Sequence, residues 1–149
     1  MPYVELSKLI EKGSKNLVVA DFGCGEDLLG QRLRRKGFTV HSFDHVAVND
    51  HVTALDVGEG VPLDEAEIDV AVFSLSLMGN NNGDYIREAA RVLAFDGRLH
   101  IVETASRLAK IDDLEARFRR LGFDLSKAEN IGQPEFCLLY TSPSPRDRG

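Results

Sequence analysis

Cysteine and long apolar runs are both scarce in this chain of 149 residues. It has two cysteines, which are too few for a disulfide framework and which favour a reducing compartment. No apolar stretch approaches the ~18 residues that a membrane span needs. The first residues also lack the basic and apolar regions of a signal peptide. We therefore expect no membrane association.

An excess of positive charge is also missing. The chain carries 18 Lys and Arg against 24 Asp and Glu, for a formal net charge of -6. Such a domain is not expected to hold nucleic acid on a broad basic surface. The basic run within residues 32–36 is expected to be a solvated helix face, with an RNA-binding patch as the alternative. The length and the 43% of hydrophobic residues are ordinary for one globular domain.

Short apolar runs alternate with segments of helical period. The alternation predicts right-handed crossovers and an α/β fold with a doubly wound, mostly parallel sheet. The run at 68–75 is nearly continuous and apolar, as expected for a central strand covered on both faces. The other strands are expected at 17–20, 39–43, 52–55 and 99–102, and the helical stripes at 28–33, 85–93 and 111–121.

A glycine-rich turn, Asp21-Phe22-Gly23-Cys24-Gly25, follows the first expected strand. Glycines at this edge of a parallel sheet let a ligand lie against the backbone. A dinucleotide pattern would place a third glycine at Leu28, and Glu26 and Asp27 would repel a pyrophosphate at the helix start. S-adenosylmethionine, whose sulfonium and ammonium groups favour nearby carboxylates, suits the turn better. The alternative is a turn that binds nothing.

Two more carboxylates are expected at the same edge. Asp44 ends the second strand, where it can accept hydrogen bonds from both ribose hydroxyls. Asp56 ends the third strand and could accept from an adenine amino group, with Val57 as an apolar wall for the ring. By itself, Asp44 could be a helix cap or a turn residue, and Asp56 could be a turn residue. Together with Asp21, they predict a nucleoside site.

The residues after the fourth strand do not reveal a catalytic group. The segment Ser74-Leu-Ser-Leu-Met-Gly79 lacks the Asn/Asp-Pro-Pro-aromatic motif of many enzymes that methylate exocyclic amines. Cys24 lies in the glycine turn and not where a cytosine-C5 methyltransferase places its nucleophile. The four histidines have no metal-ligand spacing. No catalytic residue is therefore assigned, and no metal site is predicted.

A set of short motifs stands out at residues 18–25, 43–44, 61–63, 69–79, 88–93 and 121–123. These motifs resemble the ribosomal RNA-processing protein 8 (nucleomethylin) family. The resemblance implies a Rossmann-like class I methyltransferase with a seven-stranded sheet, which uses S-adenosylmethionine in the nucleus and nucleolus. It also implies methylation of adenine ring nitrogen 1 in large-subunit ribosomal RNA, and partners in chromatin silencing.

By position, the resemblance adds Ser74 to the candidate site and supports Gly23, Asp44, Asp56 and Val57. The full set of candidate cofactor-binding residues is therefore Asp21, Gly23, Gly25, Asp44, Asp56, Val57 and Ser74. Two rival functions remain open from the sequence: a small-molecule methyltransferase of the same fold, and a cofactor-binding chromatin module without turnover.

The chain departs from the family in two places. Phe95-Asp96-Gly97 replaces the usual Pro-Gly-Gly-like turn, and the family's upstream segment, which helps to close the cofactor site, does not precede Met1. We therefore expect residues 1–136 to form a methyltransferase domain that binds cofactor but methylates ribosomal RNA poorly. Residues 137–149 resemble the translation of a transposase adapter used for sequencing libraries and are expected not to be native.

Overall fold

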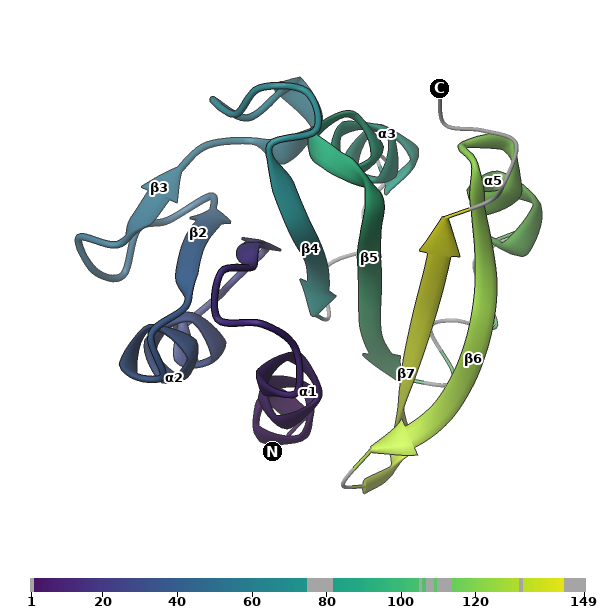
Figure 1. The fold of residues 1–149 in the computed structure, drawn as a ribbon, viewed down its shortest axis with the longest axis horizontal. Helices are drawn as coiled ribbons and strands as arrows, with labels where there is room; N and C mark the ends of the chain where they lie inside the picture. Colours follow the sequence, from purple (N-terminus) through teal and green to yellow (C-terminus); the bar gives the residue numbers. More distant parts are fainter. Residues whose placement is uncertain are drawn as a thin grey trace.

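Five parallel strands lie at the centre of the molecule (Figure 1). This computed structural model describes the backbone of residues 2–74, 82–104, 106, 109, 114–131 and 133–143, and the side chains of residues 3–73, 84–104, 106, 109 and 116–123. Within those residues the strand order is β3-β2-β1-β4-β5-β7-β6, and β7 runs antiparallel to both β5 and β6. The predicted mostly parallel α/β sheet is confirmed. The strands are β1 (Val18–Phe22), β2 (Thr39–Asp44), β3 (Val52–Ala54), β4 (Ile68–Ser74), β5 (Leu93–Thr104), β6 (Phe123–Ile131) and β7 (Gln133–Pro143).

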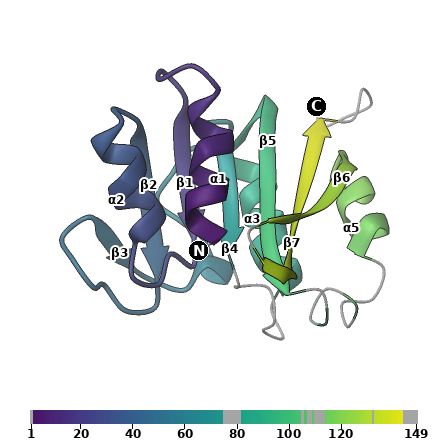
Figure 2. The same cartoon turned by 90° about the horizontal axis from the view of Figure 1, so that it is seen from below.

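Helices cover both faces of the sheet, as Figures 1 and 2 show. One hydrophobic cluster joins α1 and α2 to the sheet, and a second cluster joins α3, η1 and α5 to the other face. The described helices are α1 (Pro2–Glu11), α2 (Leu28–Arg35), the 3-10 turn η1 (Val57–Glu59), α3 (Asn82–Val92) and α5 (Leu114–Arg120). None of these described helices is long and apolar enough to cross a membrane.

The apolar run of β4 contributes to both clusters because alternate side chains of a strand point to opposite faces. Val70 and Val72 belong to the cluster with α1 and α2, whereas Ala71 and Phe73 belong to the other. The ring of Phe73 stacks on Phe22 with centroids 5.2 Å apart. This pairing fixes β4 beside β1, and the two strands bring their C-terminal ends to one edge of the sheet.

The structure differs from the sequence-based expectation at β5. The expected turn Asp96-Gly97 lies inside this strand, which begins at Leu93. Ile68 pairs with Leu93 and Val70 with Arg98, so the ladder contains a register shift that accommodates the extra residues.

No residue ranges were expected for three further elements, α1, β6 and β7, although the family resemblance implied a seven-stranded sheet. Helix α1 packs through Leu6 and Ile10, a four-residue spacing that could have indicated it. The expected start of the last helical stripe at Ile111 lies outside the described residues.

Candidate functional site

The glycine turn between β1 and α2 is tied to the end of β2. Gly23 and Gly25 adopt positive φ angles of 88° and 56°. The backbone amides of Gly23 and Cys24 both donate to the carbonyl of Phe43, at 2.8 and 3.0 Å. A Cβ built on Gly25 would meet no atom within 4 Å. The turn is therefore fixed at its base and open at Gly25, which leaves room for a ligand against the backbone.

Asp44, at the end of β2, is held by the backbone on both sides. Its Oδ2 accepts a hydrogen bond from the Gly25 amide at 2.7 Å, and its Oδ1 accepts one from the His45 amide at 2.6 Å. An ionised carboxylate has about four acceptor positions, so two amides do not exhaust it. The half-buried carboxylate is thereby oriented in advance and can still accept hydrogen bonds from a pair of hydroxyls.

Asp56 and Val57 lie where β3 leads into η1. Asp56 caps this turn, because its Oδ1 accepts from the Gly58 amide at 2.9 Å. Val57 is buried with 3% exposure. This contact agrees with the turn-residue interpretation that the sequence left open for Asp56.

Helix α3 holds the segment that follows Val57. The Val61 amide donates to Glu88 Oε2 at 2.5 Å, and Arg91 donates to the Val61 carbonyl at 3.1 Å. Arg91 also binds Glu88 at 2.7 Å, and this hydrogen bond is the main reason that the pKa of Glu88 lies below its usual value. Sequence reasoning assigned no role to these two residues, although their i, i+3 spacing signals an ion pair.

Asp21, at the end of β1, is a buried carboxyl group. Its side chain has an oxygen, Oδ1, with no hydrogen-bond partner among the described residues. The pKa of Asp21 is raised to about 7, mainly by burial and also by the charges of Asp27 and Asp44, while the charge of Arg34 opposes the shift. A buried, unpartnered acceptor near two other carboxylates is suited to a positively charged ligand group.

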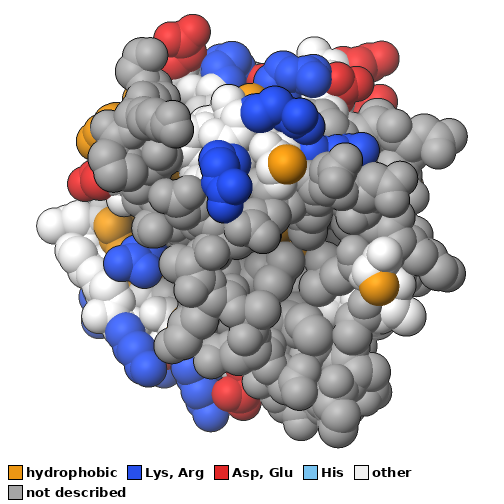
Figure 3. All heavy atoms as spheres, turned by 90° about the vertical axis from the view of Figure 1, so that its right-hand side faces the viewer, with side chains coloured by type: hydrophobic (Ala, Val, Ile, Leu, Met, Phe, Trp, Pro, Cys, Tyr) orange, Lys and Arg blue, Asp and Glu red, His pale blue; other side chains and the backbone are white. Residues whose placement is uncertain are grey.

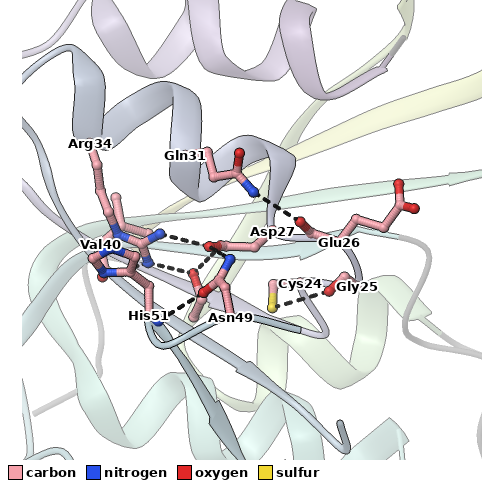
Figure 4. A network of polar contacts seen from close by, with 10 residues as sticks. Cys24, Gly25, Glu26, Asp27, Gln31, Arg34, Val40, Asn49 and His51 are labelled. Carbon is pink, nitrogen blue, oxygen red and sulfur yellow. Dashed lines mark hydrogen bonds and ion pairs between the residues drawn. The ribbon is translucent and has the colours of Figure 1, made fainter. Parts of the chain in front are cut away.

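Asp27 corrects one sequence-based expectation. It was expected to face a ligand at the start of α2, but it is fully buried with a left-handed φ of 61°. Its carboxylate binds Arg34 at 2.7 Å, Ser42 at 2.6 Å and Asn49 at 3.2 Å, as Figure 4 shows in part. The charge of Arg34 offsets that of Asp27. The exposed Glu26, and not Asp27, is therefore the residue that would repel a pyrophosphate.

Cys24 is not a nucleophile in this setting. The pKa of its thiol is raised to about 12, mainly by burial and also by the nearby charges of Asp21, Asp27 and Asp44. The thiolate is the reactive form of cysteine, so the thiol stays inert at neutral pH.

Ser74 is the last residue of β4 and lies next to the carboxyl end of β1. Its side chain lies outside the described residues, and so do residues 75–81 with the Leu-Ser-Leu-Met-Gly segment. The described candidates fall into two groups at the carboxyl edge of the sheet. Asp21 and Asp44 lie close enough for their charges to interact, and Asp56 and Val57 follow the neighbouring edge strand β3.

Gly30→Ala is expected to destabilise the fold although alanine favours helices by up to ~1 kcal/mol over glycine. A Cβ at Gly30 would overlap Asp27 Oδ1 and lie 2.8 Å from Ser42 Oγ and 3.0 Å from Arg34 Nη1. Overpacking of this kind costs about 1–3 kcal/mol. Urea unfolding measures the loss, with Arg35→Ala on the exposed side of α2 as the control. A Gly30→Ala protein at least as stable as the wild type would contradict this packing.

Comparison of the sequence with known proteins gives consistent matches. A family model described as "Hypothetical methyltransferase" matches residues 1–144. The chain is 47% identical over 130 residues to "Ribosomal RNA-processing protein 8" of Dictyostelium discoideum, covering 87% of this chain and 33% of that protein. It is 41% identical over 137 residues to the Schizosaccharomyces pombe "25S rRNA (adenine(645)-N(1))-methyltransferase", covering 90% and 42%. The chain thus spans less than half of these relatives.

Solved structures share the fold at low sequence identity. A putative type 11 methyltransferase from Sulfolobus solfataricus superposes with a TM-score of 0.74 at 19% identity, covering 97% of this chain and 93% of that one. A Burkholderia thailandensis 1,6-didemethyltoxoflavin-N1-methyltransferase, solved with bound S-adenosylhomocysteine, gives 0.72 at 17% identity, covering 96% and 77%. These similarities support the fold alone.

Proposed function

This chain belongs to the ribosomal RNA-processing protein 8 family of methyltransferases, and from that premise we propose that it transfers a methyl group from S-adenosylmethionine to ring nitrogen 1 of an adenine in large-subunit ribosomal RNA. The family relationship rests on the matched domain, while the activity, the RNA substrate and a nucleolar location are parts of the proposal.

The carboxylate of Asp44 is the observation that carries the cofactor assignment. It is fixed by the Gly25 and His45 amides beside the open space at Gly25. A ribose placed there would find an acceptor already oriented for its two hydroxyls. The unpartnered Asp21 Oδ1 supplies a second fit, because a buried acceptor favours a cationic group such as the ammonium or sulfonium of the cofactor.

The mechanism needs alignment more than proton transfer. When bound, S-adenosylmethionine supplies an electrophilic methyl group on a positively charged sulfur. The lone pair of adenine N1 is free in the neutral base, so no residue has to remove a proton before attack. The chain's own contribution is to hold the donor, and good orientation accounts for up to ~7–11 kcal/mol in favourable systems. This agrees with the absence of an assigned general base.

The protein is expected to bind S-adenosylhomocysteine and not NAD. Glu26 is exposed at the start of α2, and Asp44 accepts the amide of Gly25 that a phosphate would otherwise use. A pyrophosphate would meet negative charge in place of free donors. Titration calorimetry with both ligands checks this, and NAD binding of similar strength would show that the site is not selective in this way.

A group of arginines among the described residues favours contact with RNA, although the chain as a whole is acidic. Helix α5 carries Arg117, Arg119 and Arg120, and the last two are exposed. Figure 3 shows basic side chains gathered toward the top of the face that carries this helix. Such a patch supports attraction to a phosphate backbone, with most of the specificity expected from contacts to an unstacked base.

Transfer to RNA is tested with methyl-labelled S-adenosylmethionine and large-subunit ribosomal RNA that lacks the modification. The proposal predicts labelled 1-methyladenosine after digestion and mass spectrometry, and its loss in Asp44→Ala. Label on a small molecule only, or on another base, would reject the RNA assignment.

A further inference from the structure

A polar cluster behind the proposed cofactor site is made of Asp27, Arg34, Ser42 and Asn49. Asp27 Oδ2 accepts from Arg34 at 2.7 Å and from Asn49 at 3.2 Å, and Asp27 Oδ1 accepts from Ser42 at 2.6 Å. Arg34 also donates to Ser42 Oγ at 2.8 Å and to the Val40 carbonyl at 3.1 Å. Figure 4 shows these groups converging between α2, β2 and the loop 45–51.

The cluster connects three segments that meet at Asp44. Asp27 belongs to the turn that contains Gly25, the amide donor to Asp44. Ser42 lies two positions before Asp44 on β2, so both side chains belong to the same short stretch of strand. Asn49 lies in the loop after Asp44, and its own Oδ1 accepts from the His51 amide at 2.8 Å. One buried carboxylate therefore ties the turn to the chain on both sides of the ribose acceptor.

Two local features are built around this carboxylate. Asp27 has the left-handed backbone conformation that non-glycine residues rarely adopt, and it makes no side-chain hydrogen bond to cap α2. Gly30, one turn further on, leaves the space that Asp27 Oδ1 and Ser42 Oγ fill. An aspartate needed only to start a helix would require neither the left-handed backbone at Asp27 nor the space left by Gly30.

Charge gives Arg34 a second role. Among the described groups, its positive charge is the one that lowers the pKa of Asp21 and so counteracts part of the rise caused by burial. Arg32 of the same helix instead forms an ion pair with Glu11 of α1, at 3.2 Å. The Asp27–Arg34 pair therefore adds no net charge to the region of Asp21 and Asp44, and it keeps a buried carboxylate from standing alone there.

We propose that the pair of buried Asp27 and half-buried Arg34, with Ser42 and Asn49, is a positioning unit that holds the glycine turn and Asp44 in place and so determines how strongly the site recognises a ribose. This inference rests on the proposed function, because it concerns how the same cofactor site is oriented. Neither residue of the pair is proposed to touch the ligand.

The test measures ribose recognition and not affinity alone. The affinities of S-adenosylhomocysteine and its 2′,3′-dideoxyribose analogue are compared by calorimetry for the wild type and for Asp27→Asn/Arg34→Gln. The double substitution removes both charges together, so no unpaired charge remains buried. Arg35→Gln, an exposed position on the same helix, is the matched control. Circular dichroism and urea unfolding establish that each protein is folded.

The wild type and Arg35→Gln are expected to favour the complete ribose by roughly 10- to 150-fold, the range for hydrogen bonds to a charged acceptor. In the double variant this preference should fall to about threefold or less, while binding of the dideoxy analogue changes little. A purely structural role would weaken both ligands equally and leave the ratio unchanged, which would overturn the inference. Gly30→Ala gives an independent check, since it should reduce the same ratio without altering any charge. Wild-type protein that binds neither ligand would overturn the proposed function and this inference with it.

Discussion

Asp21→Asn is expected to make the protein more stable than the wild type above pH 7. Burial raises the pKa of Asp21 from 3.8 to about 7, so the folded protein holds this proton more tightly than the unfolded chain does. The associated stability is complete below about pH 4 and is lost as the pH rises through 7. At ~1.4 kcal/mol per pKa unit, a shift of roughly three units puts the upper limit of this loss near 4 kcal/mol. Asparagine stays neutral and avoids it.

Urea unfolding at pH 5 and pH 8 measures this difference. The advantage of Asp21→Asn should be roughly 3 kcal/mol larger at pH 8 than at pH 5, because about two of the three pH units over which the wild type loses this stability lie between these values. The exposed Asp50→Asn is the control, and it should shift stability by less than ~0.5 kcal/mol at both values. A difference between Asp21→Asn and wild type that does not change with pH would contradict the assigned titration.

The same substitution should weaken binding of S-adenosylmethionine. A neutral amide cannot attract the ammonium and sulfonium groups as a carboxylate does, and hydrogen bonds to charged groups are worth about 1.5–3 kcal/mol. Higher stability together with lower affinity is the expected signature of a buried charge kept for binding. An Asp21→Asn protein that gains stability and keeps full affinity would show that Asp21 does not contact the cofactor.

Asp44→Ala is expected to weaken S-adenosylhomocysteine binding by about 1.5–3 kcal/mol, the range for hydrogen bonds to a charged acceptor. The fold should survive, because the Gly23 and Cys24 amides remain bonded to the Phe43 carbonyl. Calorimetry gives the affinity and circular dichroism the fold, with Asp50→Ala in the following loop as the control. Unchanged affinity in a folded Asp44→Ala protein would mean that Asp44 only stabilises the turn.

The central sheet could be predicted because its strands carry local signals. Ile68 to Phe73 is a nearly continuous apolar run that is interrupted by Asp69, and Asp44 ends a short strand that begins just after a glycine. The turn at Gly23 and Gly25 was also predictable, since positive φ angles favour glycine. These signals were sufficient to bring Asp21 and Asp44 to one edge of the sheet.

The role of Asp27 could not be predicted in this way. Its partners lie seven residues away at Arg34, 15 away at Ser42 and 22 away at Asn49, and only the folded chain brings them together. A helix-start aspartate with an exposed side chain and one with a buried side chain look alike in sequence. The start of β5 was missed for a related reason, because its register shift depends on pairing with β4.

A crystal structure of the protein with S-adenosylhomocysteine is the most direct test of the proposed site. We expect the ribose hydroxyls within hydrogen-bond distance of the Asp44 carboxylate and the adenine against Val57 beside Asp56. It also predicts the amino group of the amino-acid part near Asp21, and an Asp27–Arg34 pair that keeps its present contacts. A ligand bound elsewhere on the molecule, or one at this edge with its ribose directed away from Asp44, would contradict it.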